Sequence, residues 1–92
     1  MTEQFLEELE IDGMVKIYFT PDTIIPEESR FRFEQKIKEG FFRKKIIEYK
    51  AIIKLDGEVV ECVNFTPTEL HSMKAYISQN KAKFKKMIRE MT

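Results

Sequence analysis

The chain has little of what common catalytic and metal sites are built from. Its 92 residues contain one cysteine, Cys62, one histidine, His71, and no tryptophan. A single cysteine cannot close an internal disulfide or supply a cysteine-based zinc site, and this usage fits a reducing cytoplasm. The usual zinc sites and a Cys–His nucleophile pair also lack their partners. We therefore expect no metal, no cofactor, no catalytic residue and no enzymatic activity.

Glycine is scarce as well, and its spacing excludes the common phosphate-binding loops. The three glycines, Gly13, Gly40 and Gly57, lie far apart, and none is followed by Lys-Ser or Lys-Thr. Both the dinucleotide fingerprint and the P-loop are absent for this reason. The common forms of nucleotide hydrolysis are thereby excluded.

Long apolar runs are missing too. The longest stretch without a charged residue covers the seven positions 62–68, whereas a membrane-spanning helix needs about 20 apolar residues. Residues 1–8 are acidic where a signal peptide would be basic and then apolar. We expect no membrane partner and a cytoplasmic location, in a bacterium or in an infected host cell.

Neither sign of charge dominates the chain, but the charges are segregated. Sixteen lysines and arginines balance sixteen aspartates and glutamates. Residues 1–29 carry one base and eight acids, a net charge of −7, and residues 30–92 carry the compensating +7. Two interpretations fit this pattern: the acidic segment packs beside the basic segments within one domain, or it screens a basic binding face.

Hydrophobic periodicity predicts a single α+β domain over residues 1–92, with a four-stranded antiparallel meander packed against one long C-terminal amphipathic helix. Residues 1–13 are expected to form either an acidic N-terminal arm or a short helix capped by Thr2. Residues 14–65 are assigned to the meander, and residues 66–92 to the long helix.

Within the meander, apolar and polar residues alternate over positions 14–20, 30–34 and 47–55. The second of these segments places Phe31 and Phe33 on the core face. Residues 35–45 fit neither the strand period nor the helix period, so we interpret them as a long hairpin connection.

A tight hairpin is expected at Asp56-Gly57, because this dipeptide between alternating runs favours the positive φ angles of a two-residue turn. Such a turn sets Leu55 opposite Glu58, Ile53 opposite Val60 and Ala51 opposite Cys62. We expect Cys62 to be a buried small apolar residue on the core side of its strand.

The C-terminal helix has a defined start. Thr66-Pro67-Thr68-Glu69 is a capping box with proline at the first helical position. An apolar stripe then follows at helical spacing, interrupted by Asn80. It consists of Leu70, Met73, Ile77, Phe84, Met87 and Met91.

Bases and phenylalanines concentrate around the predicted hairpin connection. The candidate binding surface consists of Arg30, Arg32, Lys36, Lys38, Phe41, Phe42, Arg43, Lys44 and Lys45. Exposed rings beside bases suit single-stranded nucleic acid, because rings stack on nucleobases while cations meet phosphates. They equally suit a protein-binding edge, with the Phe pair as anchors and the bases steering an acidic partner. In a third interpretation the Phe pair packs into the core and the charges keep an edge soluble.

Four segments suggest a family. They are Lys16-Ile17-Tyr18-Phe19, Tyr49-Lys50-Ala51-Ile52, Gly57-Glu58-Val59-Val60-Glu61 and residues 67–76. In order and character they resemble the bacterial domain of unknown function 4160 family, small proteins often encoded beside a partner in toxin–antitoxin-like gene pairs. The resemblance implies a strand, strand, hairpin and helix topology. The family's Pro-Pro-His-Phe-His run falls at Arg30-Phe31-Arg32, where arginine replaces both histidines, so no activity of those histidines carries over.

Together these observations lead us to expect a non-enzymatic binding protein. It would regulate or inhibit a protein partner in a mobile-element, phage or toxin–antitoxin-like system, through the basic and aromatic surface around residues 30–45. The alternative is direct binding of RNA or single-stranded DNA by the same surface. A further alternative is a homodimer that pairs through the apolar stripe of residues 70–91 or through an exposed strand edge.

Overall fold

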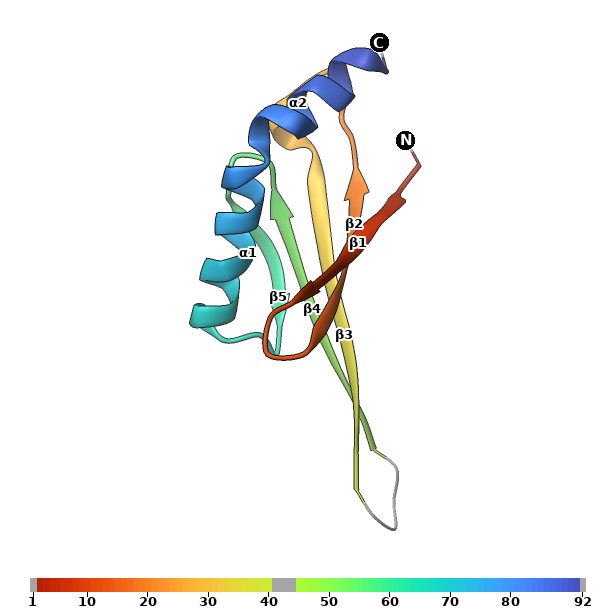
Figure 1. The fold of residues 1–92 in the computed structure, drawn as a ribbon, viewed down its shortest axis with the longest axis vertical. Helices are drawn as coiled ribbons and strands as arrows, with labels where there is room; N and C mark the ends of the chain where they lie inside the picture. The colour runs from red at the N-terminus through yellow and green to blue at the C-terminus, as the bar shows by residue number, and fades with distance from the viewer. Residues whose placement is uncertain (1, 41–44, 92) are drawn as a thin grey trace.

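The computed structural model describes residues 2–40 and 45–91, which form an antiparallel sheet of five strands followed by two C-terminal helices (Figure 1). The strands are β1 (Gln4–Glu10), β2 (Met14–Thr20), β3 (Arg30–Glu39), β4 (Lys45–Lys54) and β5 (Val59–Val63). The helices are α1 (Pro67–Gln79) and α2 (Lys81–Glu90), with a short 3₁₀ helix, η1 (Pro26–Glu28), between β2 and β3. Strand order in the sheet follows the sequence. The α+β class and the meander are therefore confirmed.

The predicted N-terminal helix is wrong, because residues 4–10 form strand β1 and pair with β2. The connecting turn contains Asp12 and Gly13, with φ angles of +48° and +111°. Ile11 N–H donates to the Gly13 carbonyl at 2.9 Å, and Gly13 N–H donates to Glu10 Oε1 at 2.9 Å. An Asp-Gly turn brings β1 beside β2, and pairing along the strand outweighs the weak local helix signal.

Residues 35–39 continue strand β3, so the predicted long connection is wrong over these positions. The register sets Lys36 opposite Glu48, Ile37 opposite Ile47 and Lys38 opposite Ile46. Strand alternation continues past Phe33, and Ile37 gains a cross-strand partner in Ile47, which extends the ladder. The candidate residues Phe41, Phe42, Arg43 and Lys44 lie outside the described residues.

The extended β3–β4 ribbon projects beyond its neighbours and gives the molecule an elongated shape (Figure 1). β2 begins only at Met14, and the last residue of β5, Val63, pairs with Lys50. We call residues 36–39 and 45–48 the arm. The described ladder with β2 ends at Glu34 and that with β5 ends at Lys50, so no described strand pairs with either edge of the arm.

The hairpin between β4 and β5 is confirmed, but its register differs from the expected one. Lys54 N–H donates to the Glu58 carbonyl and Gly57 N–H to the Lys54 carbonyl, which makes a three-residue loop with Gly57 at φ +95°. Ile53 consequently pairs with Val59 rather than Val60, and an irregularity restores the expected pairing of Ala51 with Cys62.

Two expectations for the last third of the chain are corrected. Cys62 is exposed rather than buried, because it lies on the edge strand β5. The predicted single long helix is two helices that meet at Asn80. The Asn80 side chain donates to the Tyr76 carbonyl at 2.8 Å and so competes with the helical backbone. The capping box of Thr66 and Glu69 is confirmed.

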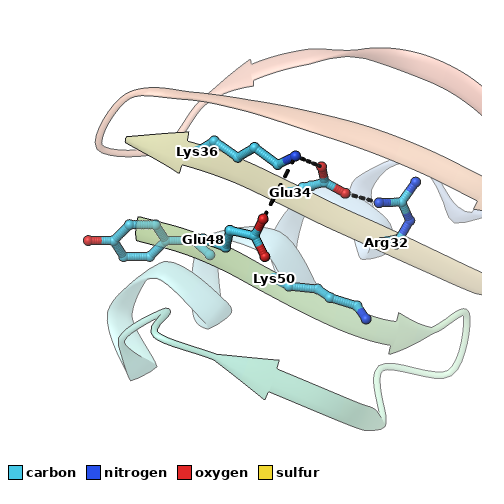
Figure 2. Close-up of a pocket in the computed structure, with 6 residues that line it drawn as sticks. Arg32, Glu34, Lys36, Glu48 and Lys50 are labelled. Atoms are coloured by element: carbon cyan, nitrogen blue, oxygen red, sulfur yellow. Dashed lines mark hydrogen bonds and ion pairs between the residues drawn. The ribbon is translucent and has the colours of Figure 1, made fainter. Parts of the chain in front are cut away.

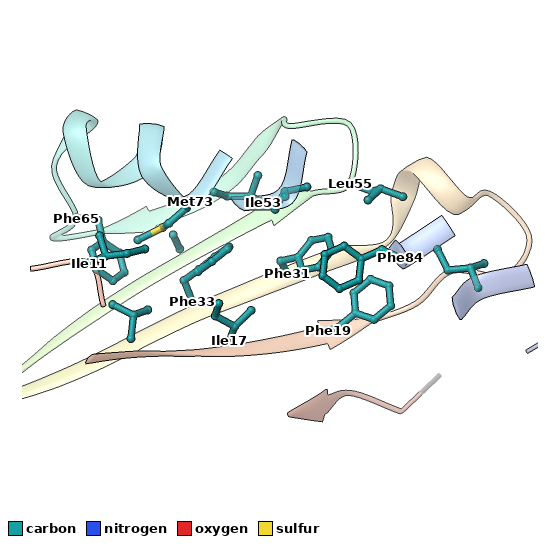
Figure 3. Packing of buried hydrophobic residues seen from close by; sticks show 14 residues of the cluster. Ile11, Ile17, Phe19, Phe31, Phe33, Ile53, Leu55, Phe65, Met73 and Phe84 are labelled. Carbon is teal, nitrogen blue, oxygen red and sulfur yellow. The ribbon is translucent and has the colours of Figure 1, made fainter. Parts of the chain in front are cut away.

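Both helices cover the same face of the sheet (Figures 1 and 3). Of the predicted stripe, Met73, Ile77 and Phe84 are buried, while Met91 is 47% exposed. The stripe packs on alternate residues of the central strands. These are Val15, Ile17, Phe19, Phe31, Phe33, Ala51 and Ile53. The opposite face of the sheet, which we call the open face, has no described element over it.

Strand β1 is also fastened to the helical layer. Tyr76 of α1 packs edge-on against Phe33, with ring centroids 6.3 Å apart. Burial, together with the nearby Glu7 carboxylate that accepts a hydrogen bond from the hydroxyl, raises the pKa of Tyr76 to about 12. The hydrogen bond from the hydroxyl to Glu7 links α1 to β1.

Candidate functional site on the open face and the arm

Strand β3 places four of the predicted bases on the open face. Phe31, Phe33 and Gln35 are buried on the helix side. Residues at the alternate positions point the other way because side chains alternate along a strand. Those positions carry Arg30, Arg32, Lys36 and Lys38. Lys45 lies at the start of β4, opposite Glu39, and so on the other face.

Arg32 is at the centre of this face and is neutralised by acids. Its Nη2 lies 2.8 Å from Glu3 Oε1 and its Nε 3.0 Å from Glu3 Oε2, and Nη1 pairs with Glu34. The hydrogen bond from Arg32 lowers the pKa of Glu3, and the same bond raises the pKa of Arg32. Glu3 of the acidic N-terminal segment therefore pairs with a base of β3, a contact that both sequence interpretations allow.

Two rings adjoin the Arg32 side chain on the open face. Its guanidinium carbon lies 4.1 Å from the centroid of the Tyr18 ring. Phe5 of β1 meets Tyr18 edge-on at 5.5 Å and is 53% exposed. Stacking on Tyr18 positions the arginine in addition to its ion pairs.

Lys36 also belongs to a network of alternating charges (Figure 2). Its Nζ lies 3.8 Å from Glu48 Oε1 and 4.0 Å from Glu34 Oε1. One strand further, Lys50 lies 3.4 Å from Glu61. Glu34, Lys36, Glu48 and Lys50 line a shallow hollow of about 240 Å³. Since acids and bases alternate across the strands, the middle of the open face has no strong net charge.

Lys54 forms a second cluster, which lies outside the predicted binding surface. Its Nζ contacts Glu58 at 2.9 Å and Glu28 at 3.0 Å, and these hydrogen bonds raise the pKa of Lys54. The cluster ties η1 to the β4–β5 hairpin. Only the four-residue spacing to Glu58 was visible in the sequence, because Glu28 is distant in the chain.

The bases of the arm differ from those in the middle of the open face in their ion pairing. Lys38 and Lys45 make no ion pair with any described residue, and the same holds for Arg30 at the other end of β3. Ile46, which pairs with Lys38 across the ribbon, is 55% exposed. The arm thus combines cations that have no counter-ion among the described side chains with an exposed apolar side chain.

A second concentration of bases, absent from the predicted surface, lies on α2. It comprises Lys81, Lys83, Lys85, Lys86 and Arg89. Lys85 and Arg89 border a groove of about 360 Å³ against Pro26 and Glu27 of η1. This helix is on the opposite layer from the open face, so it offers a control surface for charge-reversal experiments.

Residues 2–40 and 45–91 contain no group of three His, Cys, Asp or Glu side chains arranged to hold a metal ion. No helix in this part of the chain is long and apolar enough to cross a membrane. Comparison of the chain with known protein families, curated proteins and solved structures finds no match. The resemblance to the domain of unknown function 4160 family stays a prediction.

Proposed function

We propose that the protein is a non-enzymatic binding protein that regulates or inhibits a protein partner, which it captures with the arm and the adjoining open face. The projection of the β3–β4 ribbon beyond β2 and β5 carries this proposal. It exposes Ile46 beside Lys38 and Lys45, which have no described counter-ion. Unpaired bases steer an acidic partner during encounter, and an exposed aliphatic side chain supplies contact area.

The charge pattern favours a protein over a polyanion. Around Arg32 and Lys36 each base has an acidic neighbour within 4.0 Å. Carboxylates at these positions would repel phosphates, whereas mixed polar and apolar surface is ordinary at protein interfaces. The mobile-element, phage or toxin–antitoxin setting rests on the family resemblance and is part of the proposal.

The proposal is tested by reversing the charges of the arm. We expect the double variant Lys38→Glu, Lys45→Glu to lose at least about tenfold of partner capture from a lysate of the producing cells, because complementary steering becomes repulsion. Captured proteins are quantified by mass spectrometry against the wild type. Thermal stability should change little, because both substitutions are on the surface.

The matched control is Lys83→Glu, Lys85→Glu on α2, which changes the net charge by the same amount. This control should retain the partner that the arm variant loses. Equal capture by the arm variant and the wild type would contradict the assignment to the arm, as would loss in the α2 control alone.

Direct nucleic-acid binding by the same surface is the second candidate. Phe5, Tyr18 and Arg32 favour it, because exposed rings on an open antiparallel sheet can stack nucleobases. If it holds, labelled RNA or single-stranded DNA should bind in a fluorescence-anisotropy titration and weaken steeply with salt. Phe5→Ala should then cost about tenfold in affinity, while Ile24→Ala, an exposed loop residue, should cost nothing. Absence of binding at low salt would exclude this candidate.

A further inference from the structure

We infer that the outer edge of β4 in the arm binds an extended segment of the partner protein as an added antiparallel strand. The inference rests on the proposed function, because it specifies how the same surface recognises its partner. Strand addition supplies affinity through main-chain hydrogen bonds and specificity through alternate side chains.

The hydrogen bonds around β4 show which backbone groups face that edge. Lys54 N–H donates to the Glu58 carbonyl at 2.9 Å, and the Glu48 carbonyl accepts from Asn64 Nδ2 at 2.8 Å. Both groups therefore point toward β5, whereas Leu55 N–H points the other way, to Ser29. Backbone groups alternate in direction along an antiparallel strand, so the N–H and C=O of Ile46 also face the β5 side.

No described strand reaches Ile46 on that side. The ladder between β4 and β5 ends at the pair of Lys50 and Val63. The Glu48 carbonyl accepts the hydrogen bond from Asn64, so the edge of β4 is without a described strand from Glu48 outward. We call this free edge, beside Lys45, Ile46 and Ile47, the lane. A groove of about 600 Å³ runs along this lane. It is lined by Lys45, Ile46, Ile47, Glu48, Val63 and Asn64.

Two other edges of the sheet are protected in the way that edge strands usually are. The opposite edge of the arm carries the exposed side chains of Lys36 and Lys38. The outer strand β1 carries exposed Glu8 and Glu10 and an irregularity in its pairing. Charges and bulges of this kind discourage strand addition. The β4 lane instead presents Ile46 and Val63, which are 55% and 41% exposed.

The register of an added strand determines which side chains of the partner segment are favoured. In antiparallel pairing one incoming residue exchanges both hydrogen bonds with Ile46, and its side chain lies beside Ile46 and Val63 on the open face. The preceding incoming residue lies opposite Ile47, and the following one opposite Lys45. The favoured segment is therefore two consecutive apolar residues followed by an acidic residue.

A second copy of the chain fits the lane less well. Two β4 edges related by a two-fold axis would pair Ile46 with Ile46, which sets Lys45 opposite Ile47. The second copy then offers no acid to Lys45. Charge complementarity thus favours a partner segment over self-pairing.

The test selects a phage-displayed library of random peptides on the immobilised full-length protein. We expect enrichment of extended peptides with two apolar residues followed by Asp or Glu. Against Lys45→Glu the selected third residue should change to Lys or Arg. An unchanged consensus, or no enriched peptide, would overturn the inference, while capture through the arm in the lysate experiment would still support the proposed function.

Two substitutions at Ile46 separate the backbone contribution from that of the side chain. Ile46→Pro removes the outward N–H but no hydrogen bond to β3, and proline is tolerated at sheet edges. It should weaken a selected peptide at least tenfold in anisotropy titrations, whereas Ile46→Ala should weaken it only a few-fold. Equal loss in both variants would overturn strand addition. A wild-type dimer that Ile46→Pro converts to monomer would overturn the choice of occupant.

Discussion

Replacing Phe84 with alanine is expected to lower the free energy of unfolding by about 4 kcal/mol, the range found for large buried aromatics. Phe84 is fully buried and joins the helical layer to the sheet (Figure 3). Its ring centroid lies 4.7 Å from Phe31, 5.3 Å from Phe19 and 6.1 Å from Tyr76. A domain of this size has a total stability toward the low end of about 5–15 kcal/mol, so the variant should be close to unfolded at 25 °C.

Urea denaturation followed by circular dichroism measures this loss. The control is Phe5→Ala, because Phe5 is 53% exposed and its ring meets Tyr18 on the open face. Phe5→Ala should lower the free energy of unfolding by less than about 1 kcal/mol. A Phe84→Ala variant within 1 kcal/mol of the wild type would mean that α2 does not pack on β2 and β3 as described.

Local signals in the sequence predicted several elements correctly. The capping box at Thr66 marks the start of α1, because its hydrogen bonds lie within four consecutive residues. The alternation over residues 14–20 and 47–55 locates β2 and β4, since each strand has one buried face. Asp56-Gly57 marks a hairpin, although the loop has one residue more than the preferred two-residue turn.

Elements that depend on distant partners were not predictable in the same way. Residues 4–10 have no strong period of their own, and they form a strand because the Asp12-Gly13 turn brings them beside β2. The outer part of β3 is stabilised by pairing with β4 on the far side of its own hairpin. The helix break at Asn80 follows from a side-chain hydrogen bond that competes with the backbone.

The candidate surface also has features that local sequence predicts and features that depend on distant residues. That Arg30, Arg32, Lys36 and Lys38 share a face follows from the two-residue period of a strand. Their electrostatic state does not follow fully from the sequence, because one of the two acids that pair with Arg32, Glu3, lies 29 residues away. Ion pairing thus separates the arm bases from those in the middle of the face. The difference between the ion-paired bases and the arm bases is seen only when the neighbouring strands are placed in register.

Replacing Gly13 with alanine is expected to cost about 3 kcal/mol of stability for two separable reasons. Gly13 has φ +111°, where a side chain is strained by about 1–2 kcal/mol. An added Cβ would also clash with Gln35 Nε2. Gln35 is 7% exposed, and its amide donates to the Asp12 carbonyl at 3.3 Å. Displacing it leaves buried polar groups unpaired, at a further cost of about 1–2 kcal/mol.

Gly57→Ala isolates the first contribution, because Gly57 has φ +95° and nothing within 4 Å of an added Cβ. A double-mutant cycle with Gln35→Ala isolates the second, since alanine at position 35 removes the clash. We expect Gly13→Ala to cost about as much in the Gln35→Ala background as Gly57→Ala costs in the wild type, with a coupling of about 1–2 kcal/mol in chemical denaturation. Additive costs would show that Gln35 does not pack against the β1–β2 turn. In that case the buried Gln35 amide would not help to hold the acidic strand β1 against the sheet.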